Sequence, residues 1–396
     1  MRFKQALNKI IEYSLTLDGE KKDLDELRGR VLFEDIYAPM DFPSTPRSAM
    51  DGYTVCSEDI DKLPKKLSIQ GSIGVDEVGF KLKRDCAFWV NTGSPLPEGA
   101  NCVIMVEKVD VEENMVIIKE KPAIYHNVTK KGAEIKKGMK ILNRGDLINV
   151  RKWALLAHCG ITNALVFKRP KVAVFTTGNE VITPYDTYKE GKVYNTNSYI
   201  LKGLVEKWGG EFHYVTHLRD DMENIKEALD KAFLSFDVII TTGGVSRGKT
   251  DFTKKAIEEC GVNIVFSKPN VKPGRPFTFG IKNKTLLFAF SGPPAAMFMT
   301  AYAFLKPALF YMSGRGHREE LFDCKLLEDM HSKKGKLYLN RVKFIDEGLK
   351  ANVKSSGSQK PDNFFSVVNA DGFIMIDEDK GDVGKFSIFK GDRFDD

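Results

Sequence analysis

The sequence lacks paired cysteines, a histidine cluster and an apolar leader, and each absence excludes a class of protein. Its six cysteines are widely spaced with no C-x-x-C pair, which argues against a zinc ribbon, a redox motif or a disulfide scaffold. Reduced thiols of this kind are typical of the cytoplasm, which is the location we predict. The six histidines are scattered without metal-ligand spacing. The first residues have neither the apolar core nor the cleavage site of a signal peptide.

Long apolar runs are also scarce. One stretch, 285–312, is mostly apolar and long enough to span a membrane. Pro293 and Pro294 break it early, however, and Lys306 lies inside it, so we predict a strand, a turn and a buried helix. No membrane segment is predicted.

What is present fits a soluble protein of several domains. The 396 residues predict two or three domains, and hydrophobic residues make up 42% against 29% charged residues. The 60 lysines and arginines exceed the 54 aspartates and glutamates by six, and this excess is spread along the chain. We therefore predict no nucleic-acid partner, and we expect any anion to be bound by a local cluster of charge.

The pattern of apolar residues changes along the chain. It predicts an amphipathic helix at the N-terminus, with Leu7, Ile10, Ile11 and Leu15 on its apolar face, and short strands between about 45 and 132. From Lys171 apolar strands alternate with helices, which is typical of a largely parallel sheet covered on both faces. Residues 320–396 lose this alternation, and their short strands and turns predict a separate β domain.

In such a sheet, ligands bind beyond the carboxyl ends of the strands, and the loops predicted to lie there carry carboxylates and cations. These residues are Glu180, Asp220, Asp251, Arg247, Lys249, Lys268, Lys272 and Arg275. Three carboxylates at one sheet edge would repel one another unless a cation neutralises them. A hydrated Mg²⁺ held by one or two carboxylates and by ligand phosphates is the expected arrangement.

A glycine-rich turn that includes Gly243, Gly244 and Ser246 follows one predicted strand, 238–242. Glycines let a backbone approach an anion closely, and the next helix directs its N-terminal N–H groups at that anion. The spacing matches neither the dinucleotide fingerprint nor the P-loop. The turn is either an ordinary strand-to-helix connection or, as Ser246 and the nearby lysines favour, a phosphate or oxyanion site.

Structural explanations also exist for several charged residues. Asp220, Asp221 and Asp251 precede predicted helices, where an aspartate usually caps the N-terminus. Lys268 and Lys272 are compatible with ordinary surface charge. The prolines of the turn 272–276 restrict the backbone that carries them, and this favours anion binding.

Several segments together closely resemble one family, the molybdopterin molybdenumtransferases, which insert metal in molybdenum cofactor synthesis and include the E domain of gephyrin. The matching segments occur in family order along almost the whole chain: GRVLFEDIYAP (29–39), RSAMDGYTV (47–55), NTGSPLPEGANCVIMVE (91–107), TTGNEV (176–181), YNTNSYIL (194–201), LRDD (218–221), TTGGVSRGKTDFTK (241–254) and VKPGRPFTFG (271–280).

The resemblance implies an α/β multidomain fold with four parts. These are an extended linker domain (1–44 with 133–169), an inserted β-rich domain (45–132), an α/β molybdopterin-binding domain (170–314) with a mostly parallel sheet, and a C-terminal β domain (315–396). It also implies an elongated homodimer with the active cleft between subunits. The partner would then bring Asp51 and Glu134 to the cleft, although spacing alone explains Asp51 as a turn aspartate.

The implied reaction is hydrolysis of adenylylated molybdopterin with ligation of molybdate and release of AMP, dependent on Mg²⁺ or another divalent cation. Glu180, Asp220 and Asp251 would hold the metal, with Asp51 across the interface. Lys268 and Lys272 would stabilise phosphate or hold molybdate. The residues implied to bind the molybdopterin conjugate are Gly243, Gly244, Ser246, Arg247, Lys249, Arg275 and Arg341. A molybdopterin adenylyltransferase is a further expected partner.

The sequence departs from the family pattern at positions that bear on activity. After the last sheet strand, Pro293 and Ala296 replace an asparagine and a serine, and Pro361 stands where a serine is common. Each hydrogen bond lost to a charged group costs about 1.5–3 kcal/mol. Two alternatives therefore stand beside the enzyme: a diverged paralogue that binds a pterin or nucleotide without inserting metal, and a dimeric scaffold.

Overall fold

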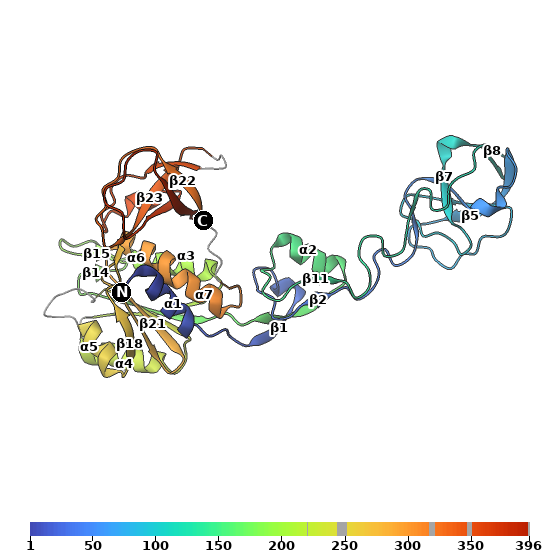
Figure 1. Cartoon of the computed structure of the whole chain (residues 1–396). Coiled ribbons are helices and arrows are strands. Elements are labelled where there is room, and N and C mark those ends of the chain that lie inside the picture. Colours follow the sequence, from blue (N-terminus) through green and yellow to red (C-terminus); the bar gives the residue numbers. More distant parts are fainter. Residues whose placement is uncertain (220, 244–251, 317–320, 347–350, 395–396) are drawn as a thin grey trace.

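A computed structural model of the chain describes residues 1–219, 221–243, 252–316, 321–346 and 351–394. The molecule is elongated (Figure 1). An α/β unit and a C-terminal β-barrel lie together at one end, a small linking region occupies the middle, and a β-rich module that contains β5, β7 and β8 forms the opposite end.

The α/β unit is built on a six-stranded sheet in the order β16-β13-β17-β21-β20-β18. Its first four strands run parallel, as the alternating pattern predicted, whereas β20 and β18 are antiparallel. The predictions missed β20. The strands are β13 (Lys171–Thr177), β16 (Glu211–Leu218), β17 (Val238–Thr242), β18 (Asn263–Ser267), β20 (Thr278–Lys282) and β21 (Thr285–Phe290), and the helices between them are α3 (Asn197–Lys207), α4 (Met222–Ala232) and α5 (Phe252–Glu259).

The third of these helices, α5, covers Phe252–Glu259, and it packs with α4 on one face of the sheet over a core that includes Ile225, Leu229 and Ile257.

The other face of the sheet is covered by α3 and by a long apolar helical segment. This segment consists of α6 (Pro294–Thr300), the π-helical η4 (Ala301–Leu305) and α7 (Lys306–Met312). By length and composition it could cross a membrane, but 89% of its most apolar stretch is buried inside the protein. The rings of Phe277 and Phe304 stack in this core with centroids 5.0 Å apart. The strand, turn and buried helix predicted for 285–312 are therefore confirmed.

The N-terminal helix α1 (Phe3–Tyr13) belongs to this core, which differs from the predicted linker segment 1–44. Phe3 packs against Phe304 with ring centroids 5.5 Å apart, and Ile10 is fully buried. Leu15, predicted on the apolar face, lies beyond the helix and is 54% exposed. Sequence periodicity identified the helix but could not show which domain its apolar face would cover.

We expect Ile10→Ala to destabilise the α/β unit by about 2–4 kcal/mol, because it removes fully buried methyl groups and leaves a cavity. Leu15→Ala is the matched control, since its side chain is largely exposed and its loss should change stability little. Urea unfolding followed by circular dichroism measures both variants. Equal stability of the two would show that α1 does not contribute to this core.

The C-terminal part forms a closed barrel. Its five strands pair in a ring, β23-β24-β22-β26-β25 and back to β23. The elements are β22 (Phe322–Leu326), β23 (Leu337–Phe344), β24 (Ala351–Ser355), α8 (Phe365–Val368), β25 (Gly372–Ile376) and β26 (Ile388–Arg393). A two-residue strand of the α/β unit, β19 (Val271–Lys272), adds to β23 in parallel and joins the two units.

The linking region and the β-rich module make up the rest of the chain. In the linking region β1 (Gly19–Asp23) pairs with β12 (Asn163–Phe167) and β2 (Ile36–Tyr37) with β11 (Lys140–Leu142), beside η1 (Leu24–Glu26) and α2 (Val150–His158). The module has a six-stranded sheet in the order β7-β4-β6-β5-β9-β8. Its elements are β3 (Arg47–Ser48), β4 (Gly52–Val55), η2 (Ser57–Asp59), β5 (Lys65–Ile73), β6 (Cys86–Val90), β7 (Cys102–Met105), η3 (Val106–Lys108), β8 (Val109–Glu112), β9 (Met115–Ile118) and β10 (Val128–Thr129).

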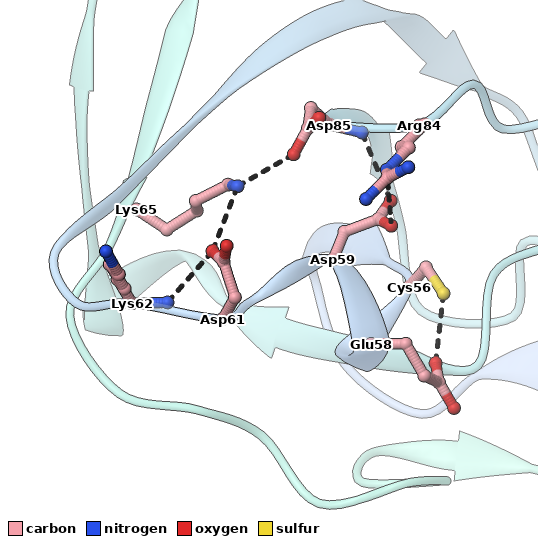
Figure 2. A network of polar contacts seen from close by, with 8 residues as sticks. All are labelled: Cys56, Glu58, Asp59, Asp61, Lys62, Lys65, Arg84 and Asp85. Atoms are coloured by element: carbon pink, nitrogen blue, oxygen red, sulfur yellow. Dashed lines mark hydrogen bonds and ion pairs between the residues drawn. The ribbon is translucent and has the colours of Figure 1, made fainter.

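A surface network of polar contacts connects η2 and β5 to the turn before β6 in this module (Figure 2). Lys65 Nζ lies 3.2 Å from Asp61 Oδ1 and 2.8 Å from Asp85 Oδ1, and the Asp85 N–H donates to Asp59. Exposed ion pairs of this kind contribute little stability each. The network's role is therefore local, and it fixes the path of the chain around the sheet edge.

Candidate active site

A cavity of about 1010 Å³ lies between the α/β unit and the barrel. The α/β unit contributes the loops after β13, β17 and β21 and the turn 272–276, which confirms that its wall includes the carboxyl ends of parallel strands. The barrel contributes the segments 328–331 and 355–361 together with Tyr338 and Asn340 of β23. Four of the predicted site residues line this cavity: Glu180, Gly243, Lys272 and Arg275.

Two glycines shape the sheet side of the cavity. Gly178 has φ +129°, and a Cβ there would lie 2.7 Å from both carboxylate oxygens of Glu180, so the glutamate folds back over this residue. Gly243 has φ +101°, and a Cβ there would lie 2.4 Å from the carbonyl oxygen of Thr177. Side chains at either position would be strained by backbone conformation and by contact. Gly243 therefore lets β13 and β17 end close together, and Gly178 leaves room for the side chain of Glu180.

The cavity wall also includes two cations on the turn 272–276. Lys272 lies on β19, which pairs with β23 of the barrel, and its ammonium lies 5.5 Å from the centroid of the Tyr338 ring. Gly274, with φ +96°, packs against α6 so closely that a Cβ would lie 1.7 Å from Thr300 Oγ1. Lys272 and Arg275 are exposed to solvent and line the cavity, so the turn presents two positive charges to the cavity that Glu180 also lines.

Arg341 lies behind the wall of the cavity and not among its lining residues. It is fully buried on β23, and its Nη2 donates to the carbonyl oxygens of Ser358 at 2.9 Å and Lys360 at 3.2 Å. Burial lowers the pKa of this guanidinium to about 10, so it stays charged at neutral pH. Its Nε and Nη1 have no hydrogen-bond partner among the described residues. Arg341 thus supports the cavity-lining segment 355–361 through Nη2, whereas Nε and Nη1 donate no hydrogen bond to the described residues.

Lys268 does not line the cavity, in contrast to Lys272 four residues later. Its side chain is exposed, its φ is +56°, and its N–H donates to the carbonyl oxygen of Phe277 at 2.8 Å. The structure therefore separates the two lysines that the sequence had grouped.

Asp51 and Glu134 are not brought to the cavity within one chain. Asp51 precedes β4 in the β-rich module, at the end of the molecule opposite the α/β unit (Figure 1). Its Oδ1 accepts the backbone N–H of Thr92 at 2.6 Å and the Thr92 hydroxyl at 2.9 Å, and these hydrogen bonds lower the pKa of the Asp51 carboxyl. Glu134 is exposed in the linking region, 3.6 Å from His158 Nε2.

Several predicted residues lie outside the described part of the chain. These are Asp220, Gly244, Ser246, Arg247, Lys249 and Asp251. Their neighbour Asp221 is described, and its side chain accepts the N–H groups of Glu223 and Asn224 at the start of α4. The capping explanation is therefore confirmed for Asp221. Within the described ranges, no group of three or more His, Cys, Asp or Glu side chains is placed to hold a metal ion.

Most of the barrel side of the cavity was missed by reasoning from sequence, which had named only Pro361 among its lining residues. Glu328 Oε1 accepts the N–H of Ser355 at 2.5 Å, and His331 forms an ion pair of 2.5 Å with Asp382. Gln359 exchanges hydrogen bonds with the backbone of Arg341, at 2.9 Å in both directions. No motif signals these residues, because they reach the cavity only when the barrel docks on the α/β unit.

The fold defines a class of protein, an elongated multidomain chain with a central α/β domain and a closed C-terminal β-barrel. Residues 1–160 match the family "MoeA N-terminal region (domain I and II)", residues 173–311 match "Probable molybdopterin binding domain", and residues 323–385 match "MoeA C-terminal region (domain IV)". The chain belongs to the molybdopterin molybdenumtransferase family.

Relatives and solved structures match this chain over nearly its whole length. The chain is 31% identical over 385 residues to the molybdopterin molybdenumtransferase of Haemophilus influenzae, covering 96% of this chain and 95% of that protein. It is 29% identical to that of Staphylococcus epidermidis, covering 94% and 90%. Two structures of a molybdopterin biosynthesis MoeA protein from Pyrococcus horikoshii match with TM-scores of 0.86 and 0.82 at 29% and 30% identity. The first covers 99% of this chain and 98% of that one, and the second covers all of both.

Proposed function

We propose that this enzyme inserts molybdate into adenylylated molybdopterin. Water cleaves the phosphoanhydride bond, and AMP leaves with one phosphate. The two dithiolene sulfurs of the remaining molybdopterin then bind molybdenum in place of one oxygen of molybdate, which leaves as water with the two thiol protons. The observation that carries this proposal is the cavity between the α/β unit and the barrel, where Lys272 and Arg275 face the same space as Glu180. Cations there can bind phosphate and molybdate oxygens, and the carboxylate can act on a metal ion or on water.

The cations are assigned to anion binding. Lys272 and Arg275 would contact the phosphate groups or molybdate directly, because both line the cavity. Arg341 would add positive potential from behind the segment 355–361, and its unused Nε and Nη1 donors would become available if that segment moved. Lys268 is the weaker assignment, since its exposed side chain does not line the cavity.

Mg²⁺ is assigned to Glu180 together with Asp220 and Asp251. Glu180 fits this role, because its carboxylate lines the cavity and has no ion-pair partner among the described residues. When bound, the metal would offset charge that develops on the bridging oxygens of the diphosphate. Gly243 lies at the same edge, and the turn that follows it through Ser246, Arg247 and Lys249 is assigned to the phosphate of the pterin.

The complete site is proposed to need a homodimer. Asp51 and Glu134 lie far from the cavity of their own chain, so a second subunit is the natural source of those carboxylates at the cleft. We place the enzyme in the cytoplasm, which agrees with its six free cysteines, and an adenylyltransferase that makes the substrate is the expected partner.

Release of AMP tests this function. The purified chain is incubated with adenylylated molybdopterin, molybdate and Mg²⁺, and AMP is separated by chromatography. We expect AMP to appear only when molybdate and a divalent cation are both present, and a chelator to stop the reaction. Absence of AMP from folded protein under these conditions would reject the proposal.

One observation favours a second candidate, a pterin-binding paralogue without turnover. Pro293, Ala296 and Pro361, which replace polar residues of the family pattern, all line the cavity. Calorimetry that shows tight binding of molybdopterin without molybdate-dependent turnover would support this candidate. Recovery of turnover in Pro293→Asn with Ala296→Ser would identify the lost polar groups as the cause.

A further inference from the structure

A second group of cations lies on the barrel, outside the set that the proposed function uses. The segment that leads into β23 carries Lys333, Lys334 and Lys336. Lys333 and Lys334 are exposed, whereas Lys336 is half-buried. A lysine side chain that is partly withdrawn from water usually packs its stem or has a partner for its charge. Neither motif nor resemblance had singled out these residues.

Backbone pairing brings Lys336 beside the cationic turn of the α/β unit. In the parallel pair of β19 and β23, Val271 lies opposite Leu337 and Lys272 opposite Tyr338. The N–H of Leu337 donates to the carbonyl oxygen of Asn270 at 2.9 Å. Lys336 directly precedes this pair, so the strand addition that places Lys272 at the cavity also places Lys336 near Lys272, at the edge of the residues that line the cavity.

The electrostatics of Lys336 agree with this placement. Burial lowers the pKa of Lys336, and repulsion from Lys272, Arg275 and Lys333 lowers it further. The structure therefore gathers four positive charges from two domains. Lys272 and Arg275, two of these four, line the cavity itself.

The nearby carboxylates are engaged elsewhere. Asp382 pairs with His331 at 2.5 Å, and Glu378 pairs with Arg2 at 3.5 Å. Glu328 and Asp329 accept backbone N–H groups from Ser355 and Lys385. Among the described residues, none of the four cations has an ion-pair partner. Like charges held together without counter-charges repel one another, and a bound anion would relieve that repulsion.

We propose that Lys336 and Lys333 extend the Lys272–Arg275 pair into a second anion subsite, which takes the diphosphate group of the substrate. This inference rests on the proposed function. A diphosphate presents two linked anionic groups and matches a cluster of cations drawn from two domains better than a single molybdate does. The barrel would thus bind substrate through its lysines as well as closing the cavity.

Binding of inorganic pyrophosphate to the full chain, measured by calorimetry, tests the subsite. We expect Lys336→Gln to weaken pyrophosphate binding about tenfold, because it removes one charge-assisted contact. Lys336→Arg should retain most of the affinity, since it keeps the charge. Lys343→Gln, an exposed lysine farther along β23, is the matched control and should bind like the unmodified chain. Unchanged melting temperatures would show that each variant is folded.

The outcomes separate this inference from the proposed function. Equal affinity of Lys336→Gln and Lys343→Gln for pyrophosphate would overturn the subsite, as would a loss confined to molybdate binding. Lys333→Gln gives an independent check, because its exposed side chain can be removed without disturbing the fold, and it should weaken pyrophosphate binding as well. If the unmodified chain binds pyrophosphate through Lys336 but releases no AMP, the proposed reaction is rejected and the subsite is still supported.

Discussion

Glu180→Gln is expected to lower molybdate-dependent AMP release by about 100-fold or more, the range seen when one group that stabilises a transition state is removed. The substitution keeps the size of the side chain and removes its charge. Glu180 lines the cavity and folds back over Gly178, so glutamine can occupy the same space without disturbing the strand end. The rate of AMP release at saturating molybdate and Mg²⁺ measures the effect.

Glu190→Gln is the control for this prediction. Glu190 is exposed in the turn before β15 (Val193–Tyr194) and does not line the cavity. Its replacement removes one negative charge from the same part of the chain and should leave the rate within about twofold, as expected for a surface charge remote from the site. If both variants were equally active, Glu180 would have no part in the reaction.

Gly274→Ala is expected to destabilise the protein by about 2–4 kcal/mol and to reduce activity more strongly than that loss alone would. A Cβ at Gly274 would lie 1.7 Å from Thr300 Oγ1 and 3.1 Å from Thr300 Cβ. Thr300 cannot simply rotate away, because it is branched, buried and donates to the carbonyl oxygen of Ala296 at 2.7 Å. The turn 272–276 must therefore shift, and Lys272 and Arg275 move with it.

A double-mutant cycle with Thr300→Ala separates the two causes of this effect. Thr300→Ala removes the contact but leaves φ of residue 274 at +96°, which an alanine adopts only with strain. The double variant should therefore recover part of the stability and part of the activity. Additive losses in the cycle would show that the contact with Thr300 is not what requires glycine at this position.

Much of the α/β fold could be predicted because strands such as β13 and β17 are apolar runs followed directly by glycine. The strand 238–242 was predicted with the bounds that the structure gives to β17. The antiparallel β20 (Thr278–Lys282) was missed, because it contains Gly280 and follows a proline-rich turn that dominates the local pattern. The core in which α1 packs could not be predicted for a different reason: an apolar face shows that a helix is buried but not against which domain.

The residues of the candidate site also differ in whether local sequence could predict them. Local pattern and the topology of a parallel sheet were enough to group four of the lining residues. Two of them follow strand ends, Glu180 and Gly243, and two lie on the stiff turn 272–276, Lys272 and Arg275. The contributions of Tyr338, Asn340 and Gln359 depend on docking of the barrel, which no local pattern encodes. Arg341 was named by position only, and the structure shows that it supports the segment 355–361 instead of facing the cavity.

The most direct test of the account is a crystal structure of the protein with adenylylated molybdopterin and molybdate. We predict the diphosphate in the cavity between the α/β unit and the barrel, in contact with Lys272 and Arg275 and within reach of Lys336. Density for the conjugate at another surface, with this cavity containing only water, would contradict the account.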